Sequence, residues 1–209
     1  MHMLDVGFLS TFFKYMKSVA EDFAILVMLN RLFMTRYVAF LRAVNVGGRV
    51  VKMEELKRLF AMPGIKNIAT YIQSGNVIFD SAAGKNALKE KIEKKLLKEL
   101  HYEVQVFLKT FDDLGAIISS NPYTEKELAG HDLHVSMLSG TPDNEGLAFV
   151  QNFIAPLEQI RVSGAEAYIL VPSKSFGNSK LDKVNLERKL KVSSTTRNWN
   201  TMNKILALE

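Results

Sequence analysis

The segment Ile65-Lys-Asn-Ile-Ala-Thr-Tyr-Ile-Gln-Ser-Gly-Asn-Val-Ile-Phe79 contains two apolar stretches separated by the polar residues 73–76. Short apolar stretches rich in β-branched and aromatic residues, on either side of a turn that contains Gly and Asn, are typical of a β-hairpin. This hairpin decides the predicted fold, because the segments before and after it can be assigned in order around it.

The segments that flank the hairpin alternate between strand and helix patterns. Before it, residues 37–41 form an apolar run, and residues 53–60 place apolar side chains at helical spacing until Pro63-Gly64 ends the helix. After it, residues 85–100 place an apolar side chain at every fourth position, and the alternation over 104–108 predicts a strand. The resulting order, β-α-β-β-α-β, is that of the ferredoxin-like unit.

The same order restarts in the second half of the chain. After a predicted linking helix at 111–119, an apolar strand at 133–138 is followed by a helix pattern at 147–154. A second hairpin then surrounds the turn at 163–166. Similar order and spacing in both halves predict an internal duplication, although few residues are identical between them.

We therefore predict an α+β protein built from two ferredoxin-like halves, with additional C-terminal helices at 180–190 and 202–206. The pattern leaves open whether the two sheets lie face to face or form one continuous sheet. The predicted divisions are an N-terminal extension (1–35), a first half (36–110), a linking helix and loop (111–130) and a second half with the C-terminal helices (131–209).

Composition places the chain among globular proteins. Of its 209 residues, 47% are hydrophobic and 23% are charged, and there is no cysteine, which excludes disulfides and thiolate chemistry. The formal net charge of +5 is compatible with an anionic partner but does not require one. We predict a soluble, cytoplasmic protein that does not interact with membranes.

Residues 1–33 differ from the remainder, because their basic and acidic side chains balance. Their apolar run at 23–29 is much shorter than the roughly 20 residues that a membrane-spanning helix needs. Two interpretations stay open. In the first, translation starts at Met34 and the extension is not made. In the second, the helical spacing of its last apolar residues marks a helix that docks on another surface.

Two polar segments in the first half are candidates for ligand contacts. Asn45-Val-Gly-Gly48 follows a strand and precedes a helix, a position where glycines let a backbone approach phosphate, and Arg42 and Arg49 lie on either side of it. Gln73-Ser-Gly-Asn76 could present two amides to a base or sugar. The alternative for both segments is simple turn chemistry, since neither matches a known phosphate-binding motif.

A third polar segment, 179–200, combines basic, hydroxyl and amide side chains with the only tryptophan. Trp199 could stack on a base, or it could fill the core while Asn198 caps the last helix. The predicted ligand-binding residues of all three segments are Arg42, Asn45, Gly47, Gly48, Gln73, Ser74, Asn76, Lys180, Arg197, Asn198 and Trp199.

Two further features carry less functional information. The helix at 85–100 is rich in lysine and contains the i, i+4 pair Glu90–Lys94; its lysines indicate a solvated face, with a nucleic-acid stripe as the alternative. His131 and His134 are three residues apart on a predicted strand and would point to opposite faces, so no metal site is predicted.

Three segments together resemble a bacterial family, domain of unknown function 1697. They are Leu41-Arg-Ala-Val-Asn-Val-Gly-Gly48, Tyr71-Ile-Gln-Ser-Gly-Asn-Val-Ile-Phe79 and the C-terminal motif that runs from Ser179-Lys-Leu181 through Asn185-Leu-Glu-Arg-Lys-Leu190 to Thr195-Thr-Arg-Asn-Trp-Asn-Thr201. The resemblance covers about 36–209 and implies two ferredoxin-like halves. It implies no activity, because none is assigned to the family. The extension departs from the family pattern and favours a start at Met34.

Two classes of function fit these residues. One is a binding module for a phosphate-bearing ligand, either a nucleotide or a short nucleic acid. The other is a small metal-independent enzyme acting on a phosphorylated or acyl metabolite, with Glu187 or Asp182 as base and Lys180 as electrophile. Amides, hydroxyls and arginines outnumber titratable pairs, so we predict binding rather than catalysis, without a cofactor or metal. A protein-interaction module is a third possibility, and the sequence does not determine the oligomeric state.

Overall fold

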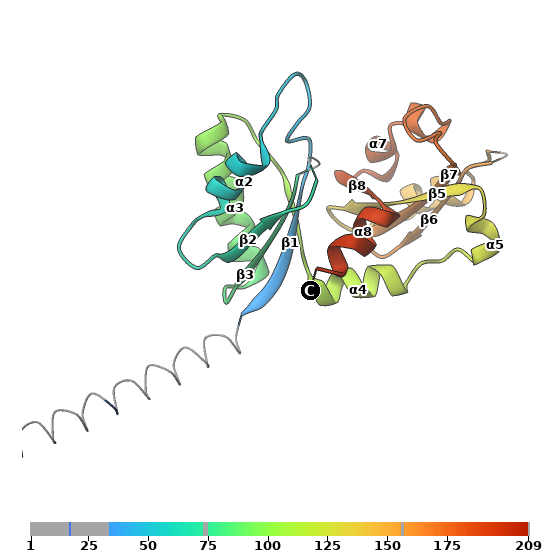
Figure 1. Ribbon diagram of the computed structural model, residues 1–209. Helices are drawn as coiled ribbons and strands as arrows, with labels where there is room; N and C mark the ends of the chain where they lie inside the picture. Colours follow the sequence, from blue (N-terminus) through green and yellow to red (C-terminus); the bar gives the residue numbers. More distant parts are fainter. Residues whose placement is uncertain (1–16, 18–33, 73–74, 156, 209) are drawn as a thin grey trace, which may run out of the picture. The chain divides into compact units, whose positions relative to one another are not determined.

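The computed structural model describes residue 17 and residues 34–72, 75–155 and 157–208 (Figure 1). The chain divides into two units, and all the elements described below lie in the second, Arg36–Glu209, apart from the first residue of the first strand. The predicted extension lies outside the described residues except for Lys17, Met34 and Thr35, and so do Gln73 and Ser74 of the predicted turn.

The first half of the second unit follows the predicted order of helices and strands. Its elements are β1 (Thr35–Leu41), α2 (Met53–Phe60), β2 (Lys66–Thr70), β3 (Asn76–Ser81), α3 (Lys85–Leu100) and β4 (Val106–Thr110). The four strands form one antiparallel sheet in the order β2-β3-β1-β4, with β4 at one edge. The helices α2 and α3 lie on the same face of this sheet (Figure 1).

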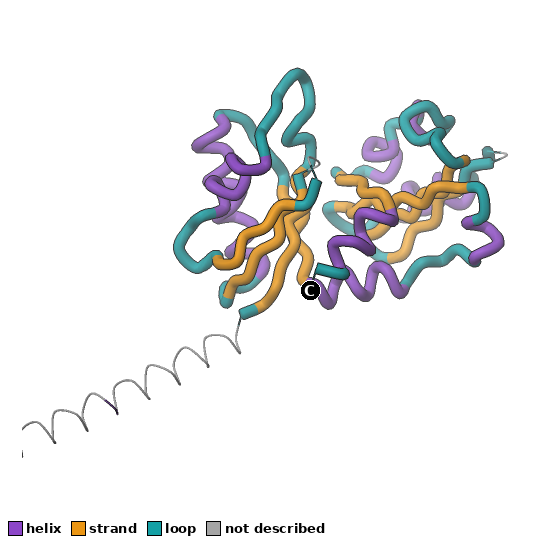
Figure 2. Tube along the Cα trace, in the orientation of Figure 1, coloured by secondary structure: helices purple, strands orange, loops and turns teal. Residues whose placement is uncertain are grey.

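The second half forms a separate four-stranded sheet in the order β6-β7-β5-β8, shown in orange in Figure 2. Its elements are α4 (Phe111–Ser119), α5 (Glu125–Leu128), β5 (His131–Leu138), α6 (Asn144–Gln151), β6 (Gln159–Ser163), β7 (Glu166–Pro172), the 3-10 helix η1 (Leu181–Lys183), α7 (Leu186–Leu190), β8 (Ser194–Asn198) and α8 (Trp199–Leu206). The described residues thus form an α+β fold with two four-stranded antiparallel sheets rather than one continuous sheet.

Local sequence explains where several helices begin. The linking helix α4 starts at the predicted position, because Thr110 and Asp113 form a capping box in which each side chain accepts the other's backbone N–H at 2.9 Å. The predicted helix at 180–190 is wrong. The Asn185 side chain accepts a hydrogen bond from the backbone N–H of Arg188 at 2.9 Å, and this cap starts the separate short helix α7 after η1.

The strand β8 was not predicted, and it completes the second sheet by pairing with β5. The predicted strand at 104–108 lies two residues later in the structure, at β4. Both differences concern short edge strands, in which tertiary pairing decides the boundaries more than local pattern does.

The core of the first half lies between its sheet and the two helices that cover it. Leu56 and Phe60 of α2 and Ile92 of α3 are almost fully buried against Phe79 of β3. The apolar stripe of α3 faces this core, which leaves its lysines on the outside. A similar cluster on the outer face of the second sheet includes Leu190 of α7.

A further cluster of buried side chains, which we call the inter-half cluster, contains residues of both sheets. Phe40 and Ile78 from the first sheet and Val135 from the second are fully buried in it, together with Met202 and Ile205 of α8. Burying a large apolar side chain stabilises a fold by about 1.5–3 kcal/mol. The two halves and the last helix therefore share one hydrophobic core.

Within the described part of the chain, no helix has both the length and the apolar character needed to cross a membrane.

Candidate functional site

A buried arginine joins the C-terminal strand to the first half. Arg197 of β8 is 8% exposed; its Nε donates a hydrogen bond to Asn76 Oδ1 at 2.6 Å, and its Nη2 donates to the Leu41 carbonyl at 3.0 Å. Its Nη1 donates to Thr195 Oγ1 at 2.9 Å and to the Thr196 carbonyl at 2.8 Å. Segments that are far apart in the sequence, at the ends of β1 and β3 and in β8, therefore meet at this side chain.

The charge of Arg197 is stabilised by dipoles, since its acceptors among the described residues are neutral oxygens. Burial lowers the pKa of Arg197 to about 10, which still leaves the side chain protonated at neutral pH. The Phe40 ring, whose centroid is 5.5 Å from the guanidinium carbon, adds a cation–π contact. Arg197 and Asn76 were predicted to contact a ligand, but both side chains are buried and bind each other.

A second arginine also joins the first half to the C-terminal segment, nearer the surface. Arg42, just after β1, donates from Nε to Glu187 Oε1 at 3.0 Å and from Nη2 to Oε2 at 2.7 Å. The backbone N–H of Ser194 also donates to Glu187, at 2.6 Å. Burial alone would raise the pKa of Glu187, but the hydrogen bonds from Arg42 and Ser194 outweigh it, so the pKa is lowered. Glu187 therefore stays ionised and holds Arg42 in one orientation.

The Glu187 connection should make stability depend on pH. The pKa of Glu187 in the folded state lies below its ordinary value of 4.5. Ionised Glu187 therefore stabilises the fold fully above pH 4.5, and this stabilisation is lost as the pH falls through the lowered pKa. We expect Glu187→Gln to lower the free energy of unfolding by about 1 kcal/mol at pH 7, a value reduced for the one-third exposure of both side chains. Urea unfolding should show that this difference shrinks at pH 3.5. An equal difference at both pH values would contradict the assignment.

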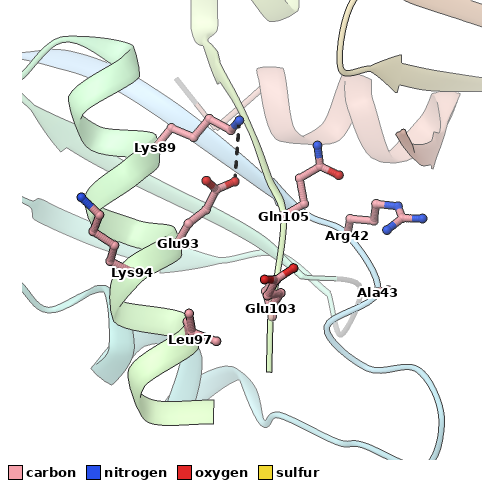
Figure 3. A pocket seen from close by; sticks show the side chains of 9 residues that line it. Arg42, Ala43, Lys89, Glu93, Lys94, Leu97, Glu103 and Gln105 are labelled. Atoms are coloured by element: carbon pink, nitrogen blue, oxygen red, sulfur yellow. Dashed lines mark ion pairs between the residues drawn. The ribbon is translucent and has the colours of Figure 1, made fainter. Parts of the chain in front are cut away.

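Beside Arg42 lies a hollow of about 510 Å³ between α3 and the segment that leads into β4 (Figure 3). Its lining residues are Arg42, Ala43, Lys89, Glu93, Lys94, Leu97, Glu103, Val104 and Gln105. In Figure 3, Lys89, Glu93 and Leu97 of α3 point toward the segment that carries Gln105, whereas the Lys94 side chain points away from it. Basic residues outnumber acidic ones in this lining, and the volume lies within the range typical of small-molecule sites.

The lysines of the hollow are only loosely paired. Lys89 Nζ lies 3.7 Å from Glu93 Oε1, and Lys94 Nζ lies 3.6 Å from Glu90 Oε2, which confirms the predicted Glu90–Lys94 pair. Such solvent-exposed pairs contribute little free energy. Glu93 has a further role, since its Oε1 accepts the backbone N–H of Val106 at 2.8 Å. Both lysines can therefore turn toward an anion at small cost.

The glycine-rich loop follows Arg42 and Ala43, which line the hollow, along the chain. Gly47 and Gly48 have φ values of +71° and +80°, so they provide a turn that other residues rarely adopt. Asn45 Oδ1 accepts the backbone N–H of Val51 at 2.8 Å, which closes the loop on itself. The glycines lie well before α2, which begins at Met53, so they do not supply the helix N-terminal amides that the sequence had indicated for phosphate.

Among the described residues, Lys180, Asn198 and Trp199 do not line the hollow. Lys180 Nζ donates to the Ile154 carbonyl at 2.9 Å, in another part of the second half. Asn198 caps α8 by accepting the backbone N–H of Asn200 at 2.8 Å, and Trp199 packs against the inter-half cluster. Their alternative roles, a helix cap and a core residue, are confirmed.

Of the residues predicted for catalysis, Glu187 and Lys180 do not contact each other; Lys180 binds the Ile154 carbonyl. The lowered pKa of Glu187 opposes a role as general base near neutral pH, because such a base works best with a pKa close to the working pH. Lys180 is engaged elsewhere, and the side chain of Asp182 lies outside the described residues. Catalysis by these groups stays a prediction without a supporting contact.

Of the residues that line the hollow, sequence reasoning predicted only Arg42 as a ligand contact; Lys89 and Lys94 entered only through the alternative interpretation of the lysine-rich helix as a nucleic-acid stripe. The lysine-rich pattern of α3 was visible, but it did not show which lysines face β4. That information comes only from the way the helix packs on the sheet.

The comparisons with known proteins concern the family and the fold. A family model described as a protein of unknown function, DUF1697, matches residues 34–168. The C-terminal motif at 179–201 lies beyond this match. The chain is similar to a solved structure, that of the conserved bacterial protein SP0830 from Streptococcus pneumoniae, with 26% sequence identity and a TM-score of 0.67 over 84% of this chain and 98% of that chain. None of the curated proteins matches it. Because the family model matches more than half of the chain, the protein belongs to the DUF1697 family.

Proposed function

We propose that this protein binds a phosphate-bearing ligand, a nucleotide or a short nucleic acid, in the hollow beside Arg42. The observation that carries the proposal is the meeting of Arg42, Lys89 and Lys94 around one cavity of about 510 Å³. Arg42 is held by Glu187 through Nε and Nη2, and among the described residues nothing accepts a hydrogen bond from its Nη1. A planar guanidinium with free donors suits a phosphate oxygen.

We also propose that the two halves are ferredoxin-like units related by duplication. The support is their matching strand order. In each sheet the first strand along the sequence lies between the third and the fourth, and the second strand lies at the edge. A duplicated pair would have diverged in its helices, since α3 has sixteen residues and the second half has the short α7 in the corresponding stretch.

The binding proposal predicts opposite effects for the two partners of one ion pair. Glu187 offsets part of the Arg42 charge and repels a nearby anion, so Arg42→Gln should weaken ATP binding about tenfold, whereas Glu187→Gln should strengthen it. Isothermal titration calorimetry with ATP and with pyrophosphate measures both effects. Raising the salt concentration should weaken binding of either probe.

Two variants on α5 provide charge-matched controls, because Glu125 and Lys126 are exposed and do not line the hollow. Lys126→Gln should leave ATP affinity unchanged where Arg42→Gln lowers it, and Glu125→Gln should not reproduce the gain from Glu187→Gln. Binding of neither probe at millimolar concentration, or equal effects of the site and control variants, would refute the proposal.

A further inference from the structure

A second hollow continues the first along β4. It has a volume of about 190 Å³, and it shares Lys89 and Gln105 with the hollow beside Arg42. Its other lining residues include Lys85, Lys109 and Ser139. Together the two hollows follow the backbone from residue 103 to residue 109 without interruption. We call this continuous depression the β4 groove.

The backbone edge that faces the β4 groove is already occupied by the protein's own side chains. β4 is the last strand of its sheet, and the Arg42 N–H bonds the Gln105 carbonyl on the β1 side, so the N–H groups of alternate residues point outward. The Val106 N–H donates to Glu93 at 2.8 Å, and the Thr110 N–H donates to Asp113 at 2.9 Å. An added peptide strand would find these donors taken, which is how natural sheets protect their edges.

What the β4 groove offers instead is a row of cationic side chains. Of its described lining residues, the basic ones are Arg42, Lys85, Lys89, Lys94 and Lys109, whereas the acidic ones are Glu93 and Glu103. Lys85 and Lys89 are four residues apart on α3, so their backbones are about 6 Å apart along the helix axis. This step resembles the spacing of neighbouring phosphates in an extended nucleic-acid strand.

At its far end the groove holds two lysines in fixed positions. Lys85 Nζ lies 2.5 Å from Asp113 Oδ2, and Lys109 Nζ lies 2.6 Å from Glu166 Oε1. These carboxylates approach from α4 and from β7, and an ammonium group has three donors, so each lysine can bind a carboxylate and a phosphate oxygen at once. Residues 103–109 in extended conformation span roughly 20 Å, which is longer than a single nucleotide.

We propose that the ligand is a single-stranded nucleic acid whose phosphates follow the β4 groove from Arg42 to Lys85 and Lys109. This proposal rests on the proposed function, and it specifies the ligand class. It requires no base-specific contact. The strand binds through its charges, with Leu97, which is 46% exposed, and Gln105 available beneath the bases.

The test measures fluorescence anisotropy with labelled oligothymidylates of two, four, six and eight nucleotides, and competition by ATP. Affinity should rise with length until the groove is filled and then level off. The slope of log affinity against log salt concentration should steepen over the same range, because more phosphates are neutralised. Lys85→Gln should weaken binding of the eight-nucleotide strand about fivefold and ATP binding less than twofold, whereas Lys89→Gln should weaken both.

Thermal melting of each variant shows that it is folded, and Lys126→Gln is the charge-matched control. Equal affinity for ATP and for the eight-nucleotide strand, with no selective effect of Lys85→Gln, would overturn the groove proposal while the proposed function stands. Binding of none of the probes would overturn both. Tighter binding of inorganic polyphosphate, or of an oligoglutamate peptide, than of the eight-nucleotide strand would assign the groove to another polyanion and also overturn the proposal.

Discussion

Replacing Arg197 with Met should lower the free energy of unfolding by about 3 kcal/mol. The Met side chain fills much of the same space, but it removes the hydrogen bonds from Arg197 to Asn76 Oδ1 and to the buried Leu41 carbonyl. Each buried acceptor without a partner costs about 1–3 kcal/mol. Met carries no charge, so the variant avoids the free-energy cost of burying the guanidinium. The expected destabilisation is therefore smaller than the summed cost of all the acceptors that lose Arg197.

Urea unfolding followed by circular dichroism measures this effect as a shift in midpoint at constant slope. Arg188→Met is the matched control, because Arg188 is an exposed arginine on α7 in the same half of the protein. The double variant with Asn76→Ala should lose less than the sum of the single losses, since both changes remove the same hydrogen bond. A loss no greater than that of Arg188→Met would show that the buried contacts contribute nothing.

Replacing Gly75 with Ala should destabilise the protein by about 2–4 kcal/mol for two reasons. Gly75 has φ +71°, a conformation that is unfavourable for any residue with a Cβ atom. A Cβ at this position would also lie 2.7 Å from Val44 Cγ1 and 3.1 Å from Leu41 Cβ. Val44 and Leu41 are almost fully buried, so neither can move away without disturbing the end of β1.

Gly47 provides the matched control for this substitution. It has the same φ of +71°, but a Cβ there would meet nothing within 4 Å. Gly47→Ala should therefore show only the conformational cost of about 1–2 kcal/mol. The difference between the two variants in thermal or urea unfolding isolates the steric part. Equal losses of unfolding free energy in the two variants would mean that the close approach of residues 41, 44 and 75 does not contribute to the destabilisation.

Most of the fold could be predicted from the sequence because its signals are local. The apolar spacing of α3 and the apolar run at 77–79 are visible in single windows, and both lie in the predicted elements, α3 and β3. The strand β8 could not be predicted in the same way. Its residues, 194–198, contain no apolar alternation, and they form a strand because β5 offers an unpaired edge.

The candidate site could be predicted only in part. Arg42 was identified from its place beside the glycine-rich loop, and it does line the hollow. Arg197 was grouped with it as a basic residue of the C-terminal polar segment. The two arginines have different environments: Arg197 is buried among neutral acceptors, whereas Arg42 binds one carboxylate near the surface. Burial depends on how β8 pairs, and a charge count cannot reveal it.

The shared core has a consequence for biosynthesis. During translation the first sheet emerges from the ribosome before α8, which supplies Met202 and Ile205 to the inter-half cluster. Until then the faces of Phe40 and Ile78 lack their final covering, and exposed apolar surface on a nascent chain attracts chaperones and promotes aggregation. Complete folding therefore requires that α8 has left the ribosome, and stop codons introduced before residue 199 should yield insoluble product.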